Sequence, residues 1–168
     1  MRGGGGGQRH ALGGGANRYR DERLRAWGAD AALGLLTYRV AESRYALDLR
    51  IAGRHVAVAA TDLAELEPLL RRMAPAHVLL NNLVSYPDAV AMLDRVREVA
   101  AAGQLEVPLH DYFPVCPTVT LLDASGRYCG IPGPAQCAAC LAAVKLPLPG
   151  QARTRDIGRW RAAWGALL

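Results

Sequence analysis

Short apolar runs alternate with stretches of helical periodicity along this chain of 168 residues. Runs of about four to eight residues that are apolar, or apolar at every second position, predict strands, and apolar residues three or four positions apart predict helices. The predicted strands cover residues 33–40, 45–51, 55–59, 77–80 and 105–109. The predicted helices cover residues 16–27, 62–73, 87–102 and 156–168. Because strands and helices alternate, we expect an α/β fold with a doubly wound, mostly parallel sheet.

Local signals mark the ends of several of these elements. The dipeptide Ala52-Gly53 between two predicted strands is typical of a β-hairpin, which would add an antiparallel edge to the sheet. Asp62 and Glu65 match a capping box, in which each side chain bonds a backbone N–H at the start of a helix. Gly103 follows the third predicted helix and is expected to end it.

Composition divides the chain into a leader and one domain. Residues 1–15 contain eight of the 18 glycines, and we expect them to form a disordered leader. Residues 16–168 are long enough for a single Rossmann-like domain with its own core. Within that domain, residues 112–155 contain all four cysteines and show little periodicity, which predicts an irregular, cysteine-rich insertion.

Polar side chains follow the fourth and fifth predicted strands, Asn81 and Asn82 after one, and His110 and Asp111 after the other. Ligands of parallel α/β sheets bind at the carboxyl ends of the strands, so Asn82 is a candidate for substrate binding. His110 can bond a sugar hydroxyl or a phosphate, or act as a base, and with Asp111 it is the catalytic candidate. The alternatives are a histidine that caps the strand end and an aspartate that braces the loop.

A glycine-rich segment precedes the first predicted helix. Gly13, Gly14 and Gly15 would let the backbone approach a phosphate, and the helix that begins near Asn17 would offer unpaired N–H groups. These four residues are further candidates for substrate binding. The alternative is a flexible glycine leader, because a phosphate-binding loop should also follow a strand.

The chain has no apolar run near the roughly 20 residues that span a bilayer, and no apolar segment of a signal peptide follows Arg2. We therefore expect a cytoplasmic protein. In that reducing compartment, clustered cysteines act more often as metal ligands or free thiols than as disulfides.

The four cysteines have the spacing C-x12-C-x7-C-x2-C. Four thiolates can close a tetrahedral site around zinc, and a C-x-x-C turn places two ligands on one side of the ion. We therefore expect structural zinc on Cys116, Cys129, Cys137 and Cys140, of which Cys116 lies farthest along the chain from the others. Unliganded thiols, an iron–sulfur cluster and disulfides remain open as alternatives.

The net charge of +5 is concentrated at the two ends. Residues 1–30 contain six arginines against three acidic residues, and residues 151–168 contain four against one. One interpretation is a basic surface for phosphate groups, nucleic acid or an acidic membrane face. The other, which we favour, is two solvated helices that bear arginine. No aromatic residues interleave with a basic run, so no specific nucleic-acid partner is predicted, whereas a peripheral membrane contact stays open.

Four segments resemble a known family. They read LGGGANRYRDE (12–22), HVLLNNLVSYPDAV (77–90), HDYFPVCPTVTLLDASGRYCGIPGPAQCAACL (110–141) and IGRWRAAW (157–164). Together they resemble the N-terminal half of bacterial retaining glycosyltransferases of the GT-B fold, with a cysteine-bearing insertion after a His-Asp-Tyr segment. The chain departs from that pattern in two places. Glycine and arginine stand where the first strand belongs, and the chain stops where the linker to a second Rossmann-like domain would start.

The resemblance implies a function. The chain would be the acceptor-side domain, or a fragment, of an enzyme that transfers a sugar from a sugar nucleotide to a saccharide or lipid-linked acceptor. Gly13, Gly14 and Gly15 would line the cleft near a phosphate, and His110 would lie close to the transferred sugar. The chain alone would be inactive, because the second domain of such enzymes contains most of the sugar-nucleotide site. The alternative is a non-catalytic, zinc-stabilised α/β binding module.

Overall fold

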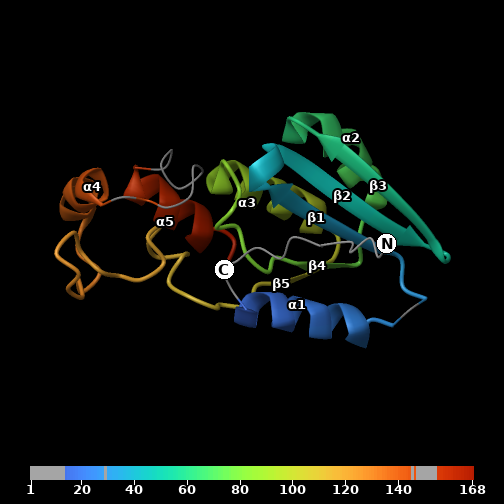
Figure 1. The fold of residues 1–168 in the computed structure, drawn as a ribbon, viewed down its shortest axis with the longest axis horizontal. Helices are drawn as coiled ribbons and strands as arrows, with labels where there is room; N and C mark the ends of the chain where they lie inside the picture. The colour runs from blue at the N-terminus through green and yellow to red at the C-terminus, as the bar shows by residue number, and fades with distance from the viewer. Residues whose placement is uncertain (1–13, 29, 145, 147–154) are drawn as a thin grey trace, which may run out of the picture.

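Two separate β-sheets and five α-helices make up the structure, a computed structural model that describes residues 14–28, 30–144, 146 and 155–168 (Figure 1). The strands are β1 (Leu33–Arg39), β2 (Arg44–Ile51), β3 (Arg54–Ala60), β4 (His77–Leu79) and β5 (Gln104–Glu106). The helices are α1 (Gly14–Ala26), α2 (Leu63–Met73), α3 (Ala89–Ala100), α4 (Pro134–Ala143) and α5 (Ile157–Gly165), with a short 3₁₀ turn, η1 (Val40–Glu42), after β1.

The first sheet is an antiparallel meander in the order β1-β2-β3. Its hairpin is the predicted one: Ile51 pairs with Arg54, and Ala52 and Gly53 form the turn with φ of 49° and 74°. Two successive residues with positive φ are what a two-residue turn needs to match the twist of the flanking strands. Local chain geometry therefore determines the register of this sheet.

The second sheet contains only β4 and β5, which are parallel and pair over three residues each. The expected α/β class is confirmed. In the described residues, however, the mostly parallel sheet of a doubly wound fold is reduced to this pair. The predicted hairpin of β2 and β3 is not an edge of the parallel sheet. It belongs to the separate antiparallel sheet, where β1, which was expected among the parallel strands, pairs with β2. Strand β5 also ends at Glu106 rather than at residue 109.

Helix α2 begins where its sequence signal places it, whereas α1 begins two residues earlier and α3 two residues later than predicted. Asp62 accepts a bond from the Ala64 N–H, and Glu65 accepts one from the Asp62 N–H, which completes the capping box of α2. The side chains of Asp88 and Asp156 cap α3 and α5 by accepting the N–H groups of Ala91 and Arg159. No helix in the described part of the chain is long and apolar enough to cross a membrane.

One hydrophobic core joins the two sheets to the cysteine-bearing segment. Leu47 of β2, Leu93 of α3 and Trp160 of α5 are each at most 1% exposed and belong to the same buried cluster. Cys116 and Leu141 from the cysteine-bearing segment belong to it too. The insertion is therefore packed into the core.

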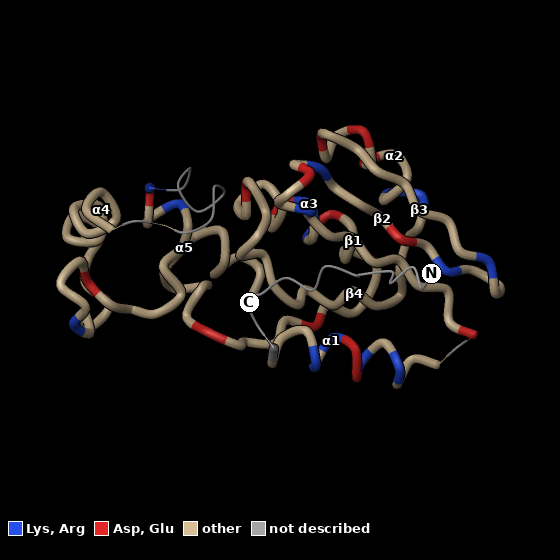
Figure 2. Tube along the Cα trace, viewed as in Figure 1, with Lys and Arg blue, Asp and Glu red and all other residues tan. Residues whose placement is uncertain are grey.

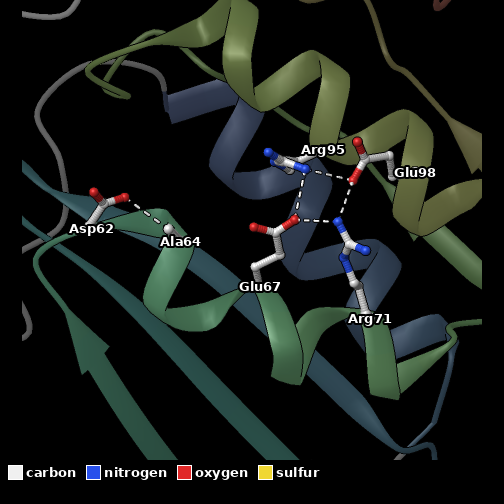
Figure 3. A network of polar contacts seen from close by, with 6 residues as sticks. All are labelled: Asp62, Ala64, Glu67, Arg71, Arg95 and Glu98. Carbon is white, nitrogen blue, oxygen red and sulfur yellow. Dashed lines mark hydrogen bonds and ion pairs between the residues drawn. The ribbon is translucent and has the colours of Figure 1, made fainter.

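Charged side chains join α2 to α3 on the surface (Figure 3). Glu67 of α2 accepts bonds from Arg71 on its own helix and from Arg95 on α3, at 2.5 and 2.8 Å. Glu98 lies beside both arginines. These side chains are partly exposed, so the network adds little stability beyond the packing of the two helices.

The cysteine-bearing segment contains more regular structure than its sequence suggested. Residues 134–143 form α4, which the pattern did not predict because alanine and cysteine give a weak apolar periodicity. Before it, Val119, Leu121 and Ile131 all have positive φ, which is rare for residues with branched side chains. Arg161 of α5 braces this strained stretch by donating to the carbonyls of Val115 and Pro132.

Candidate functional site

A small hollow opens where β4 and β5 end. Its lining includes four polar residues, Asn81, Asn82, His110 and Asp111, and the aromatic residue Trp164. The structure thus brings together, at the carboxyl edge of the parallel pair, the residues that strand order had singled out. The enclosed volume is about 20 Å³, which suits a single water molecule. A larger ligand would therefore lie over the hollow rather than inside it.

His110 lies at the rim of the hollow and is exposed. Its Nε2 is 3.0 Å from Asn81 Oδ1, and its ring packs edge-on against the ring of Tyr19 at 5.5 Å between centroids. Nδ1 of His110 has no hydrogen-bond partner in the described part of the chain. One ring nitrogen is therefore used for positioning and the other is available to a ligand.

Asn81 connects His110 to the start of α1. Its Nδ2 donates to the carbonyl of Ala16 at 3.1 Å, while its Oδ1 faces the imidazole. Gly15 comes directly before Ala16, is exposed, and a Cβ added to it would meet no heavy atom within 4 Å. The glycine end of α1 and His110 thus lie on two sides of one asparagine, with open space at Gly15.

A charged cluster behind His110 fastens α1 to β5. Glu106 of β5 accepts bonds from the Tyr19 hydroxyl and, at 2.5 Å, from Arg23, and it lies 3.2 Å from His77 Nε2. Trp27 closes the cluster by packing edge-on against the ring of His77. Tyr19 and Arg23 are four residues apart, so both side chains project from one face of the helix.

These contacts determine the charge of Glu106. The bond from Tyr19 contributes most to lowering the pKa of the carboxylate; partial burial opposes that effect, and Arg23 and His77 lower the pKa further. The same bond raises the pKa of Tyr19. A neutral phenol therefore donates to an ionised carboxylate, and the ring of Tyr19 is held in place beside His110.

Trp164 supplies an unpaired donor near the hollow. It is 5% exposed, and its Nε1 has no hydrogen-bond partner in the part of the chain that the structure describes. A buried N–H without a partner costs roughly 1–3 kcal/mol. A water or a ligand oxygen in the hollow would remove that cost.

The remaining predicted site residues have more modest roles in the structure. Asn82 Oδ1 accepts the N–H of Val84, and Asp111 Oδ1 accepts the N–H of Phe113, so each braces its own loop. For Asp111 this is the bracing role given above as the alternative to catalysis. Asn17 lies within α1, and the partner of its side chain is Arg20. Gly13 lies outside the described residues, and Gly14 is the first residue of α1.

Two members of the cluster were not identified from the sequence. Glu106 interrupts the apolar run at 105–109, and a charged residue inside a predicted buried strand was the signal that could have found it. Tyr19 lies in the first predicted helix and carries no signal of its own in the sequence. Its partner is 87 positions away, so no local pattern could show the contact.

Cys140 lies within electrostatic reach of Cys116 and Cys129. Burial is the main cause that raises the pKa of Cys140, and the N–H of Ala124 opposes it. The charges of Cys116, Cys129 and Asp123 raise that pKa further. These cysteines come together although 12 and 10 residues separate them along the chain.

The fourth thiol points elsewhere. Cys137 Sγ lies 3.3 Å from Arg161 Nη2 and 3.4 Å from the carbonyl oxygen of Pro132. Among the described residues, no three His, Cys, Asp or Glu side chains are arranged to hold a metal ion. As placed, the cysteines therefore do not fit a four-thiolate zinc site, and zinc binding stays a prediction.

Three of the four arginines of α1 pair with acidic side chains. Figure 2 shows acidic and basic residues interspersed along α1. The pairs are Arg18 with Glu22, Arg20 with Asp21 and Arg23 with Glu106. Arg25 donates instead to the backbone carbonyl of Asp21. Both interpretations of the basic N-terminal region stay predictions.

No protein-family model, curated protein or solved structure matches this chain significantly. The hollow at the ends of β4 and β5 and the chemistry of its lining are therefore the features that can indicate a function.

Proposed function

We propose that the hollow is the acceptor side of a glycosyl-transfer site in a Rossmann-like domain. The observation that carries the proposal is that Asn81 joins the glycine start of α1 to His110 at the carboxyl edge of a parallel strand pair. In α/β folds, this edge is where ligands bind. Strands β4 and β5 and helix α3 between them form one βαβ unit, the repeating element of such folds.

The lining suits a carbohydrate hydroxyl. His110 offers Nδ1 as an acceptor, and Trp164 offers an N–H donor. A hydroxyl group over the hollow can donate to Nδ1 of His110, and a water inside it can accept from the Trp164 N–H. In this proposal His110 bonds or deprotonates the acceptor hydroxyl, Asp111 and Asn82 shape the rim, and the open backbone at Gly15 faces a phosphate of the sugar nucleotide.

The test uses the whole chain, labelled with ¹⁵N, and two sets of probes. Methyl glycosides of glucose, galactose and N-acetylglucosamine represent the acceptor, and UDP-glucose and GDP-mannose represent the donor. We expect the methyl glycosides to shift the side-chain signals of His110 and Asn82 at millimolar concentration. We expect sugar nucleotides to bind only weakly and no turnover, because the chain would supply the acceptor side alone.

Two variants make the binding test specific. His110→Ala should abolish the shift at Asn82, whereas His55→Ala, an exposed histidine on β3, should leave it unchanged. Failure of every methyl glycoside to shift the signals of the hollow would overturn the proposal. Micromolar binding of either sugar nucleotide would overturn the assignment to the acceptor side.

A second candidate is a non-catalytic α/β binding module stabilised by zinc. The proximity of Cys116, Cys129 and Cys140 favours it, although Cys137 would have to leave Arg161 to complete the site. Elemental analysis of protein purified without added metal tests it: about one zinc per chain is expected. Sub-stoichiometric metal together with four freely titratable thiols would show that this candidate is wrong.

A further inference from the structure

We propose that Asn81 is a positioning residue that fixes His110 in the tautomer with the proton on Nε2, so that Nδ1 is presented to a ligand hydroxyl as a hydrogen-bond acceptor. The role of Nδ1 toward a sugar rests on the proposed function above. The tautomer itself depends only on the contacts among α1, Asn81 and His110.

The orientation of the Asn81 amide follows from its neighbours. The carbonyl of Ala16 can only accept, so the group that faces it at 3.1 Å must be the NH₂ of Asn81. In the flipped orientation, Oδ1 would face the Ala16 oxygen, and two acceptors would repel. The Asn81 oxygen is therefore directed at His110, 3.0 Å from Nε2.

The protonation of the imidazole follows from the orientation of the amide. A neutral histidine has one N–H donor and one bare nitrogen, and a neighbouring acceptor selects which nitrogen has the proton. Because Asn81 presents an oxygen, Nε2 must be the donor and Nδ1 the bare nitrogen. The exposed Nδ1 can then accept a hydrogen bond from a hydroxyl or remove its proton.

A second contact keeps the ring in that position. The Tyr19 ring packs edge-on against His110, and the Tyr19 hydroxyl is held by Glu106. Helix α1 thus supports the imidazole twice, through the Ala16 carbonyl that orients Asn81 and through the Tyr19 ring. This explains why a helix remote in sequence from His110 belongs to the site.

Nitrogen NMR of the whole chain tests the inference without any substrate. Long-range ¹H–¹⁵N spectra at alkaline pH distinguish a protonated from a bare ring nitrogen. We expect His110 to show a protonated Nε2 and a bare Nδ1. Asn81→Leu, which removes the acceptor, should replace this pattern by averaged signals of the two tautomers. Asn81→Asp loses the bond to the Ala16 carbonyl but keeps an acceptor oxygen toward His110, and it should retain the proton on Nε2.

His77 is the control within each spectrum. Its Nε2 faces Glu106 and does not touch Asn81, so its signals should stay the same in both variants if the fold is intact. A proton on Nδ1 of His110 in the unmodified chain, or an unchanged His110 pattern in Asn81→Leu, would overturn the inference. If the His77 signals also change in Asn81→Leu, that variant is not correctly folded. The spectra of the unmodified chain and of Asn81→Asp then test the tautomer of His110.

Titration with the methyl glycosides separates this inference from the proposed function. A sugar hydroxyl that bonds His110 should shift the Nδ1 signal far more than the Nε2 signal. A fixed tautomer with no response to any glycoside would uphold the role of Asn81 and contradict the glycosyl-transfer proposal.

Discussion

The antiparallel sheet and the parallel pair differ in what holds them together. Strand β2 pairs along seven positions with β1 and seven with β3, and its turn follows directly from two residues with positive φ. Strands β4 and β5 pair along three positions and are separated by a whole helix. The parallel pair is held to α1 mainly by side-chain hydrogen bonds, between Tyr19 and Glu106 and from Asn81 to the Ala16 carbonyl.

The difference explains where the candidate site lies. Long ladders use the backbone groups of the antiparallel sheet, and Tyr45, Leu47 and Leu49 of β2 pack into the core. The short pair ends early and leaves its polar side chains to be satisfied by α1 and by the loops that follow. A ligand can then compete for those side chains, as at functional sites on loops held by a rigid scaffold.

Replacement of Trp160 in α5 should have the largest effect on stability. The ring is 1% exposed, packs edge-on on Phe113, and donates from Nε1 to the Phe113 carbonyl at 2.8 Å. Trp160→Ala should lower the free energy of unfolding by about 3–5 kcal/mol, measured by urea denaturation. Hydrogen exchange should accelerate first around Phe113 and later in β2.

The control Trp160→Phe keeps most of the apolar contact and loses the hydrogen bond. It leaves the Phe113 carbonyl without this donor and should cost about 1–3 kcal/mol. Equal acceleration of exchange in β2 and around Phe113 would show that Trp160 supports both equally through the shared core.

Substitutions at two glycines test whether backbone atoms or movable side chains surround each sheet. A Cβ at Gly103, just before β5, would lie 2.5 Å from the Pro75 carbonyl oxygen and 2.8 Å from that of Ala76. Because backbone atoms cannot move aside cheaply, Gly103→Ala should cost about 1–3 kcal/mol. A Cβ at Gly34 in β1 would meet the end of the Met73 side chain, which can rotate away.

We therefore expect Gly34→Ala to change the free energy of unfolding by less than about 0.5 kcal/mol. Thermal and urea denaturation of both variants measure the difference. A cost for Gly34→Ala as large as that for Gly103→Ala would show that the backbone contact at β4 and β5 is not the cause.

A further prediction concerns the charge of Glu106. Its pKa is lowered in the folded chain, chiefly by the bond from Tyr19, so its stabilisation is present at neutral pH and is lost as pH falls through the folded pKa. Glu106→Gln should lower the free energy of unfolding at pH 7 by about 1 kcal/mol, since the carboxylate is partly solvated. The difference from the unmodified chain should shrink toward zero below pH 4.

Glu65→Gln is the matched variant beside the antiparallel sheet. The backbone N–H of Asp62 is the main cause that lowers the pKa of Glu65, so its effect should fade in the same acid range. Hydrogen exchange distinguishes the two variants. Glu106→Gln should accelerate amide exchange in α1 and β4, and Glu65→Gln should accelerate it only at the start of α2. Faster exchange in β4 in both variants would contradict the expectation that Glu106 stabilises the parallel pair and Glu65 only the start of α2.

The sequence by itself determined the elements whose causes are local. The hairpin at Ala52-Gly53, the capping box at Asp62 and Glu65, and the positions of most helices and strands all follow from residues a few places apart. The polar residues after β4 and β5 could be singled out for the same reason, because strand ends are local features. The helix at 134–143 was missed because alanine and cysteine mark no clear apolar face.

Only the tertiary structure decided how the strands pair and which side chains meet. The apolar pattern of β1 is compatible with pairing to β2 and with pairing to the parallel strands, so the sequence could not show that β1 pairs with β2. The contacts of Glu106 with Tyr19 and of Asn81 with Ala16 join residues 87 and 65 positions apart. The direction of Cys137 toward Arg161, rather than toward the other thiols, was likewise invisible in the spacing of the cysteines. Periodicity records which residues are buried, and it does not record which partner each of them finds.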